Sequence, residues 1–130
     1  MVIIIDYKSI RMKNKKEIKL NPAIYKLGNY EFSCPIEVTT NAINGKWKIL
    51  ILHRLSEKQY LRFSELKKEV ENVSEKMLIQ HLKELERDEL VSRKVYPVVP
   101  PKVEYSLTEK GKLFVPVIDA MRQFGKLFNK

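Results

Sequence analysis

The stretch SEKMLIQHLKELERDELVSRKVYPVVPPKVEYSL (74–107) decides the fold of this chain. Ser74 is a typical N-cap, and apolar residues come after it at the helical spacing i, i+4 and i+7, namely Leu78, Leu82 and Leu85. Two short alternating segments, 91–96 and 102–107, come next and are separated by the rigid tip PVVPP. Prolines lack an amide donor and suit an exposed tip. The stretch therefore predicts an amphipathic helix followed by a β-hairpin.

The segments before this stretch predict three more helices. CPIEVTTNAING (34–45) has proline at its start and glycine just past its end, which is typical of a helix. KWKILILHRLSEK (46–58) predicts a helix with one apolar face, formed by Trp47, Leu50, Ile51 and Leu55. YLRFSELKKEV (60–70) predicts a short extended piece, Tyr60 to Phe63, and then a helix capped by Ser64 whose Leu66 and Val70 face inward.

The end of the chain predicts one long helix, TEKGKLFVPVIDAMRQFGKLF (108–128), capped by Thr108 and kinked at Pro116. Its apolar stripe is broad and comprises Phe114, Val117, Ile118, Met121, Phe124 and Phe128. An apolar face of that size on a terminal helix is either core or interface. The predicted fold class is α+β, in the order helix, helix, short strand, helix, helix, hairpin, helix.

Composition narrows the functional classes. The chain has 130 residues, which suits one domain, and 25 Lys+Arg against 16 Asp+Glu give a net charge of +9. Such a charge favours nucleic acid or an acidic membrane surface as partner, although a basic protein that binds neither remains an alternative. No apolar run approaches the length of a membrane span, and MVIIIDYK (1–8) has no basic region ahead of its apolar residues. We therefore expect a cytoplasmic protein without a membrane partner.

Residues 1–33 differ from the rest of the chain, because they carry seven Lys+Arg against three Asp+Glu and lack apolar periodicity. Val2 to Tyr7 suits a short strand, and the Lys-rich segment 10–20 suits a frayed helix or a disordered arm. We expect a flexible basic extension here, with a DNA-touching arm as the alternative, and a folded domain over residues 34–130.

Five motifs carry a resemblance to a known family. They are CPIE (34–37), INGKWKILIL (43–52), RFSELKK (62–68), SEKMLIQHLKELERDELV (74–91) and RKVYPVVPPKVEYSLTEKG (93–111). In this order and spacing the chain resembles the HxlR-type winged helix-turn-helix transcriptional regulators, relatives of the MarR group. The resemblance implies a homodimer, built from the first helix and the long C-terminal helix, that binds double-stranded DNA at pseudo-palindromic operators.

The resemblance makes the helix from residue 74 the DNA-reading element. Its outward face holds the candidate contacts, which are Ser74, Lys76, Ile79, Gln80, Lys83 and Arg87, with His81 between the faces. Gln80 is suited to adenine, and Ile79 to a thymine methyl group. The family usually has Thr at the position of Ile79 and Arg at that of His81, so no operator sequence carries over. The alternatives are a core-rim role for Ile79, packing for His81 and a solvated surface for the lysines.

Phosphate contacts are expected from two further places. Ser64 lies at the start of the preceding helix, where backbone amides also point at anions. Arg93, Lys94 and Lys102 lie on the predicted hairpin and would neutralise phosphates or enter the minor groove, which positions a protein without specifying bases.

Cys34 is the only cysteine, so neither an intramolecular disulfide nor a site of several thiolates is possible. With only His53 and His81 besides, we expect no metal or cofactor. Cys34 precedes Pro35 at a helix start, where a thiol is activated. Some members of the family are similar to redox or electrophile sensors that use this cysteine. The alternative is an inert structural thiol, and the sequence indicates no small-molecule effector.

Other functions fit less well. A winged helix used only for protein–protein contacts would not need basic residues around the helix and hairpin. RNA binding lacks the aromatic platform of the common modules. An enzyme is not expected, because no catalytic triad, carboxylate pair or glycine-rich phosphate loop is present.

Overall fold

The structure, a computed structural model, describes residues 23–130, so the predictions for Val2–Tyr7 and for the Lys-rich segment after it lie outside the described residues. The chain divides after Val38 into two compact units. Among residues 23–130 no helix has the length and apolar content needed to cross a membrane.

The first unit contains a β-hairpin that the sequence patterns did not predict. Strands β1 (Tyr25–Leu27) and β2 (Tyr30–Phe32) are antiparallel, and Leu27 pairs with Tyr30 across a two-residue turn. Gly28 opens that turn with φ 60°, a conformation that glycine adopts at no steric cost. Residues 25–32 thus form a regular hairpin. The Gly-Asn pair between two aromatic-containing segments was the available signal.

Helix α2 (Pro35–Ala42) begins and ends as predicted. Its first residue is Pro35, whose missing amide costs nothing in the first turn. Gly45 comes after the end with φ 80°, which allows the chain to turn into the next helix.

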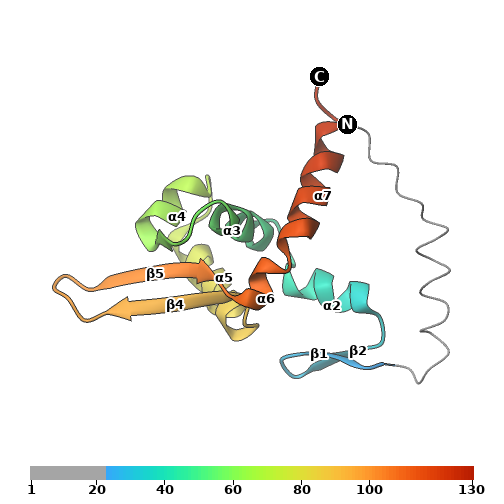
Figure 1. The fold of residues 1–130 in the computed structure, drawn as a ribbon, viewed down its shortest axis with the longest axis horizontal. Coiled ribbons are helices and arrows are strands. Elements are labelled where there is room, and N and C mark those ends of the chain that lie inside the picture. The colour runs from blue at the N-terminus through green and yellow to red at the C-terminus, as the bar shows by residue number, and fades with distance from the viewer. Residues whose placement is uncertain (1–22) are drawn as a thin grey trace. The chain divides into compact units, whose positions relative to one another are not determined.

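The second unit is a winged helix-turn-helix. Three helices, α3 (Trp47–Ser56), α4 (Phe63–Glu69) and α5 (Glu75–Arg87), pack on an antiparallel sheet of order β3-β5-β4. The strands are β3 (Leu61–Arg62), β4 (Val91–Tyr96) and β5 (Lys102–Leu107). Figure 1 shows the β4–β5 hairpin projecting beyond these helices as the wing. The predicted α+β class and element types of this unit are confirmed.

The core confirms the inward faces predicted for α4 and α5. Leu66, Val70, Leu78, Leu82 and Leu85 are all at most 2% exposed. Helix α3 has no exposed residue along its length, because α5, α4, β5 and α7 all contact it. It is the central helix of this unit.

The predicted cap of α4 was wrong by two residues. Arg62 is the N-cap, and its backbone amide donates to the Glu65 side chain at 2.9 Å. Ser64 is already in the first turn and exposed. The acidic side chain at the third helical position thus satisfies the amide of the N-cap residue, as in one half of a capping box.

The predicted single C-terminal helix was also wrong. The segment forms two helices, α6 (Glu109–Lys112) and α7 (Val115–Lys126), with Pro116 in the first turn of α7, where proline starts a helix rather than kinking it. The predicted cap is confirmed, since Thr108 Oγ1 accepts from the Gly111 amide at 2.9 Å. A Cβ on Gly111 would lie 2.1 Å from the Leu90 carbonyl oxygen. This glycine therefore lets α6 approach the corner between α5 and β4.

Candidate nucleic-acid interface

The outward face of α5 is free of the core. Ile79 is 40% exposed, and the other exposed candidates on this helix are Lys76, Gln80, Lys83 and Arg87. The helix starts where predicted, because Ser74 Oγ accepts from the Met77 amide at 3.1 Å. The Ser74 hydroxyl therefore caps the start of the helix. Cations, an amide and one apolar side chain thus share a face that no other part of residues 39–130 covers.

His81 lies on the buried side of α5 rather than between its faces. It is 8% exposed, and its Nδ1 lies 3.7 Å from Glu84 Oε2. The helical spacing places residue 81 next to Leu78 and Leu85, which explains its burial. His81 is therefore packed against the protein in this structure, which was the alternative to a DNA contact.

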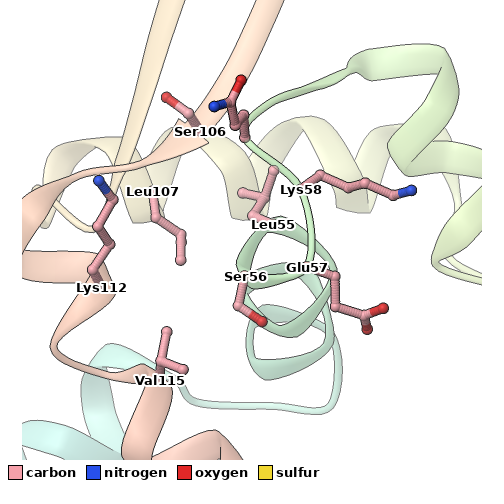
Figure 2. Close-up of a pocket in the computed structure, with 9 residues that line it drawn as sticks. Leu55, Ser56, Glu57, Lys58, Ser106, Leu107, Lys112 and Val115 are labelled. Atoms are coloured by element: carbon pink, nitrogen blue, oxygen red, sulfur yellow. The ribbon is translucent and has the colours of Figure 1, made fainter.

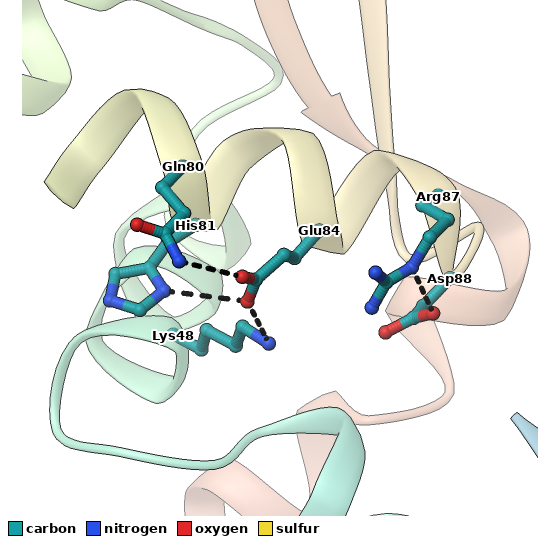
Figure 3. A network of polar contacts seen from close by, with 6 residues as sticks. All are labelled: Lys48, Gln80, His81, Glu84, Arg87 and Asp88. Carbon is teal, nitrogen blue, oxygen red and sulfur yellow. Dashed lines mark hydrogen bonds and ion pairs between the residues drawn. The ribbon is translucent and has the colours of Figure 1, made fainter. Parts of the chain in front are cut away.

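Glu84 connects α5 to the central helix (Figure 3). Lys48 of α3 is 2% exposed, and its Nζ lies 2.5 Å from Glu84 Oε2. The hydrogen bond from Lys48 is the main reason that the pKa of Glu84 falls below its ordinary value of 4.5. A buried ammonium group needs such a partner. The pair therefore fixes α5 against α3.

The same carboxylate orients the candidate base-reading amide. Gln80 Nε2 donates to Glu84 Oε1 at 3.1 Å, one helical turn away (Figure 3). The Gln80 side chain is thereby held against the helix surface, with its amide oxygen free to accept. Neither Lys48 nor Glu84 was among the predicted site residues, because a lysine inside an apolar segment gives no sequence signal of its partner.

The wing places its predicted cations on two different faces. Side chains alternate along a strand, so Arg93 and Lys94 point to opposite sides. Lys94 pairs in register with Glu104, whereas Arg93 pairs with the core residue Tyr105. Lys94 and Lys102 therefore share the outer face of the sheet, as the alternation predicted for Lys102 and Glu104, while Arg93 lies on the face that leads into the core.

Glu104 is the centre of that outer face. Its carboxylate accepts from Lys102 Nζ at 3.0 Å and from the Tyr96 hydroxyl at 3.0 Å, and it is only 7% exposed. Burial raises the pKa of Glu104, but the hydrogen bonds from Lys102 and Tyr96 outweigh burial, so that its pKa lies below 4.5. The ammonium groups of Lys94 and Lys102 lie 4.8 and 4.9 Å from the centre of the Tyr96 ring.

Ser64 and the wing border one open pocket of about 560 Å³. Arg62 and Ser64 line it from the start of α4, and Lys102 lines it from the wing, beside the apolar tip Val98–Pro101. The structure thus brings Ser64 and Lys102 together, two candidates that are 38 positions apart in the sequence, and adds Arg62 to them. Sequence alone did not indicate this neighbourhood, since it depends on the pairing of β3 with β5.

A second pocket of about 520 Å³ lies at the end of β5, on the far side of this strand from the tip of the wing (Figure 2). Its lining comes from the end of α3, from β5 and from the α6–α7 region, with Leu55, Leu107 and Val115 as its apolar residues. Lys58 and Lys112 stand at its edge. The sequence indicated no effector pocket, because its walls come from two segments that are far apart in the sequence, 55–59 and 106–115.

Cys34 lies in the first unit, immediately before α2, and is partly exposed. Its carbonyl oxygen accepts from the amides of Glu37 and Val38, so it forms the start of the helix as predicted. Within residues 23–130 no group of three or more His, Cys, Asp or Glu side chains is arranged to hold a metal ion.

Comparison with known proteins agrees with this geometry. The chain matches the HxlR-like helix-turn-helix family over residues 42–130. It is 46% identical over 102 residues to an HTH-type transcriptional regulator of Methanothermobacter thermautotrophicus, covering 78% of this chain and 77% of that protein. It is 52% identical over 95 residues to the HTH-type transcriptional regulator YkvN of Bacillus subtilis, covering 73% and 80%. The chain belongs to the HxlR-like helix-turn-helix family.

Solved structures extend the agreement to the fold. A MarR-family transcriptional regulator from Porphyromonas gingivalis W83 is similar with a TM-score of 0.69 and 41% identity, covering 75% of this chain and 93% of that one. The redox regulator HypR in its oxidized form gives a TM-score of 0.70 and 39% identity, covering 75% and 99%. The protein is a helix-turn-helix transcriptional regulator, and the alternative of a purely protein-binding winged helix is not favoured.

Proposed function

We propose that this regulator is a homodimeric repressor that reads a pseudo-palindromic operator in double-stranded DNA. Helix α5 enters the major groove, and the wing lies along the phosphate backbone. The single observation that carries the proposal is the division of α5 into an inner leucine face and an outer face with Lys76, Ile79, Gln80 and Lys83. A helix with that outer face offers hydrogen bonds, a methyl contact and phosphate neutralisation together.

The residues have separate roles in this proposal. Gln80 and Ile79 contact bases, with the Gln80 oxygen free to accept from an adenine amino group. Lys76, Lys83 and Arg87 contact phosphates, as do Ser64, Lys94, Lys102 and, from the other face of the wing, Arg93. His81 supports the helix from its buried side, and Ser74 caps it.

Dimerisation is proposed through α7. Its outward side carries Val117, Met121 and Phe124, and Leu127 and Phe128 come directly after it, all between 39% and 75% exposed. The rings of Phe124 and Phe128 meet edge to face, with centroids 5.5 Å apart, which makes one continuous apolar surface. Such a surface on a small regulator is an interaction site. Two α5 helices related by the resulting two-fold axis would then reach half-sites about 34–36 Å apart.

A redox response through Cys34 is a second part of the proposal. It is supported by the partial exposure of Cys34 beside Pro35 and by the similarity to HypR, for which oxidized and reduced structures are known. With one cysteine per chain, oxidation joins two subunits or attaches a small thiol. We assign the DNA-binding and dimerisation domain to residues 34–130, preceded by a basic extension, and a regulator of this kind acts in the cytoplasm without enzymatic activity.

The test measures binding of the purified protein to DNA from upstream of its own gene by fluorescence anisotropy. We expect tighter binding to this DNA than to a scrambled duplex, with a log–log salt slope that changes by about −0.9 for each phosphate contact. Gln80→Ala should reduce the preference, whereas Lys83→Met should weaken binding to both duplexes. Equal affinity for the two duplexes would reject operator reading, and transcription that does not fall on addition of protein would reject repression.

The redox part is tested separately on the same DNA. Treatment with a thiol oxidant should change the affinity of the wild-type protein and leave Cys34→Ser unaffected. An oxidant effect that persists in Cys34→Ser, or no effect in either protein, removes Cys34 from the proposal and leaves the DNA-binding part standing.

A further inference from the structure

We propose that Glu104 is a positioning residue for DNA binding, whose buried carboxylate holds the cations of the outer sheet face in place. This inference rests on the proposed function. It makes an unusual prediction, namely that an acidic residue strengthens binding to a polyanion.

The sheet register surrounds Glu104 with positive charge on both sides. Its direct cross-strand neighbours are Arg62 on β3 and Lys94 on β4. Lys102 lies two residues earlier on the same strand and therefore on the same face. Three cations thus face one carboxylate, and the cluster keeps a net positive charge.

The contacts are specific rather than a diffuse attraction. Lys102 and Tyr96 each contact the carboxylate at 3.0 Å, through different oxygens. The Tyr96 ring in turn lies under the ammonium groups of Lys94 and Lys102, at 4.8 and 4.9 Å. Tyr96 therefore links Lys94 to the same arrangement by a cation–π contact.

Holding these side chains in advance favours binding. A lysine side chain has many rotamers and loses conformational entropy when it is fixed, and fixing it before binding removes part of that cost from the association. The carboxylate itself is 7% exposed and lies beneath the cations, so an incoming phosphate meets the ammonium groups first. Arg62 and Lys102 also line the pocket beside Ser64, which places the organised charge between α4 and the wing.

The competing explanation is bulk electrostatics. If only net charge mattered, Glu104→Gln would bind DNA more tightly, because it removes one negative charge at nearly constant shape. Glu71→Gln is the matched control, since Glu71 is exposed and, within the described chain, no hydrogen bond or ion pair of its side chain is found. The two variants have the same net charge, and they differ in whether the original carboxylate was buried among cations or free at the surface.

The experiment measures operator affinity across a salt series for the wild type and both variants, with thermal unfolding as a check on folding. We expect Glu71→Gln to bind as tightly as the wild type or slightly better. Glu104→Gln should bind about tenfold more weakly, as removal of a charge-assisted hydrogen bond would give. Its salt slope should shrink by about 0.9 for each phosphate that the variant no longer neutralises. A purely structural role would lower the melting temperature without reducing the salt slope.

A double variant locates the effect. If Glu104 acts through Lys102, Glu104→Gln combined with Lys102→Met should bind no more weakly than Lys102→Met alone. Equal or tighter binding by Glu104→Gln, with a wild-type protein that binds its operator, overturns this inference and leaves the proposed function intact. A wild-type protein that does not bind the operator overturns both.

Discussion

Helices α5 and α7 are both amphipathic, but only α5 buries its apolar face within the described chain. Helix α5 buries its leucines against α3 and β4, inside the same subunit. Helix α7 buries only Ile118, while Met121 and Phe124 on the neighbouring turns remain 48% and 65% exposed. Fully burying one such side chain contributes about 1.5–3 kcal/mol. Within residues 39–130 these side chains of α7 are not buried, so their hydrophobic free energy is available for association with another surface.

The difference separates two kinds of mutational effect. Changes on the inner face of α5 should alter the stability of one subunit, independently of protein concentration. Changes on the apolar face of α7 should alter association, and their effects should depend on concentration. The proposed operator binding needs both, because α5 must be folded and the proposed dimer must hold two copies of it at the spacing of the half-sites.

The largest effect is expected from Phe124→Asp on α7. A buried charge at a subunit interface is strongly unfavourable, so the variant should be monomeric at micromolar concentration and should lose on the order of a hundredfold in operator affinity, as loss of the second half-site implies. Light scattering after gel filtration measures the mass, and anisotropy measures binding.

The matched control is Lys126→Gln, which changes the charge of the same helix by the same amount on the side away from Met121 and Phe124. It should remain dimeric. A dimeric Phe124→Asp would show that α7 is not the interface, and the comparison between the helices would fail.

The next effect concerns the two faces of α5. Leu78→Ala removes a side chain that is fully buried and should reduce the free energy of unfolding by about 2–5 kcal/mol. Ile79→Ala, one residue on but 40% exposed, should change stability by less than about 1 kcal/mol and should alter binding to the operator instead. Chemical denaturation compares them. Similar losses of stability in the two variants would mean that the faces are not divided as described.

The α5 face was predictable because a leucine repeat at helical spacing is a local signal. Leu78, Leu82 and Leu85 needed no knowledge of the rest of the fold. The wing was predictable from alternation and prolines, which are local too. The family motifs then indicated that the helix and the wing together form a DNA-binding unit.

The features that the sequence did not reveal depend on contacts between distant segments. Lys48 and Glu84 meet across two helices, and Arg62 meets Glu104 only because β3 pairs with β5. The break before α7 was missed for a different reason. A proline inside an apolar periodic segment fits either a kink or a new helix start, and the preceding turn around Gly111 decides between them.

A smaller effect is expected at the end of α5. Leu90 donates to the Leu85 carbonyl at 2.9 Å, and Glu89 between them has φ 62°, the left-handed position that glycine usually occupies after a helix. Glu89→Gly should therefore stabilise the protein by roughly 0.5–1 kcal/mol, independently of protein concentration. Asn72→Gly, at φ 69°, should gain less, because asparagine tolerates this conformation. Thermal unfolding at two concentrations measures both, and destabilisation by Glu89→Gly would contradict the assignment.

The smallest effect is the pH dependence of the Lys48–Glu84 pair that joins α5 to α3. The pKa of Glu84 is lowered in the folded protein, chiefly by the Lys48 hydrogen bond, so its contribution to stability is complete above pH 4.5 and is lost as pH falls through the folded pKa. Gln80 and His81 face the same carboxylate and lower its pKa less than the Lys48 hydrogen bond does. Protonation of one carboxylate can lower the free energy of unfolding by at most about 1.4 kcal/mol per pH unit. The loss at Glu84 should be smaller, because solvent screens a carboxylate that is 25% exposed. Chemical unfolding between about pH 6 and pH 3 should therefore show a smaller acid-induced loss of stability in Lys48→Met than in the wild type. Identical dependence of stability on pH in the two proteins would mean that this pair does not hold α5 in place.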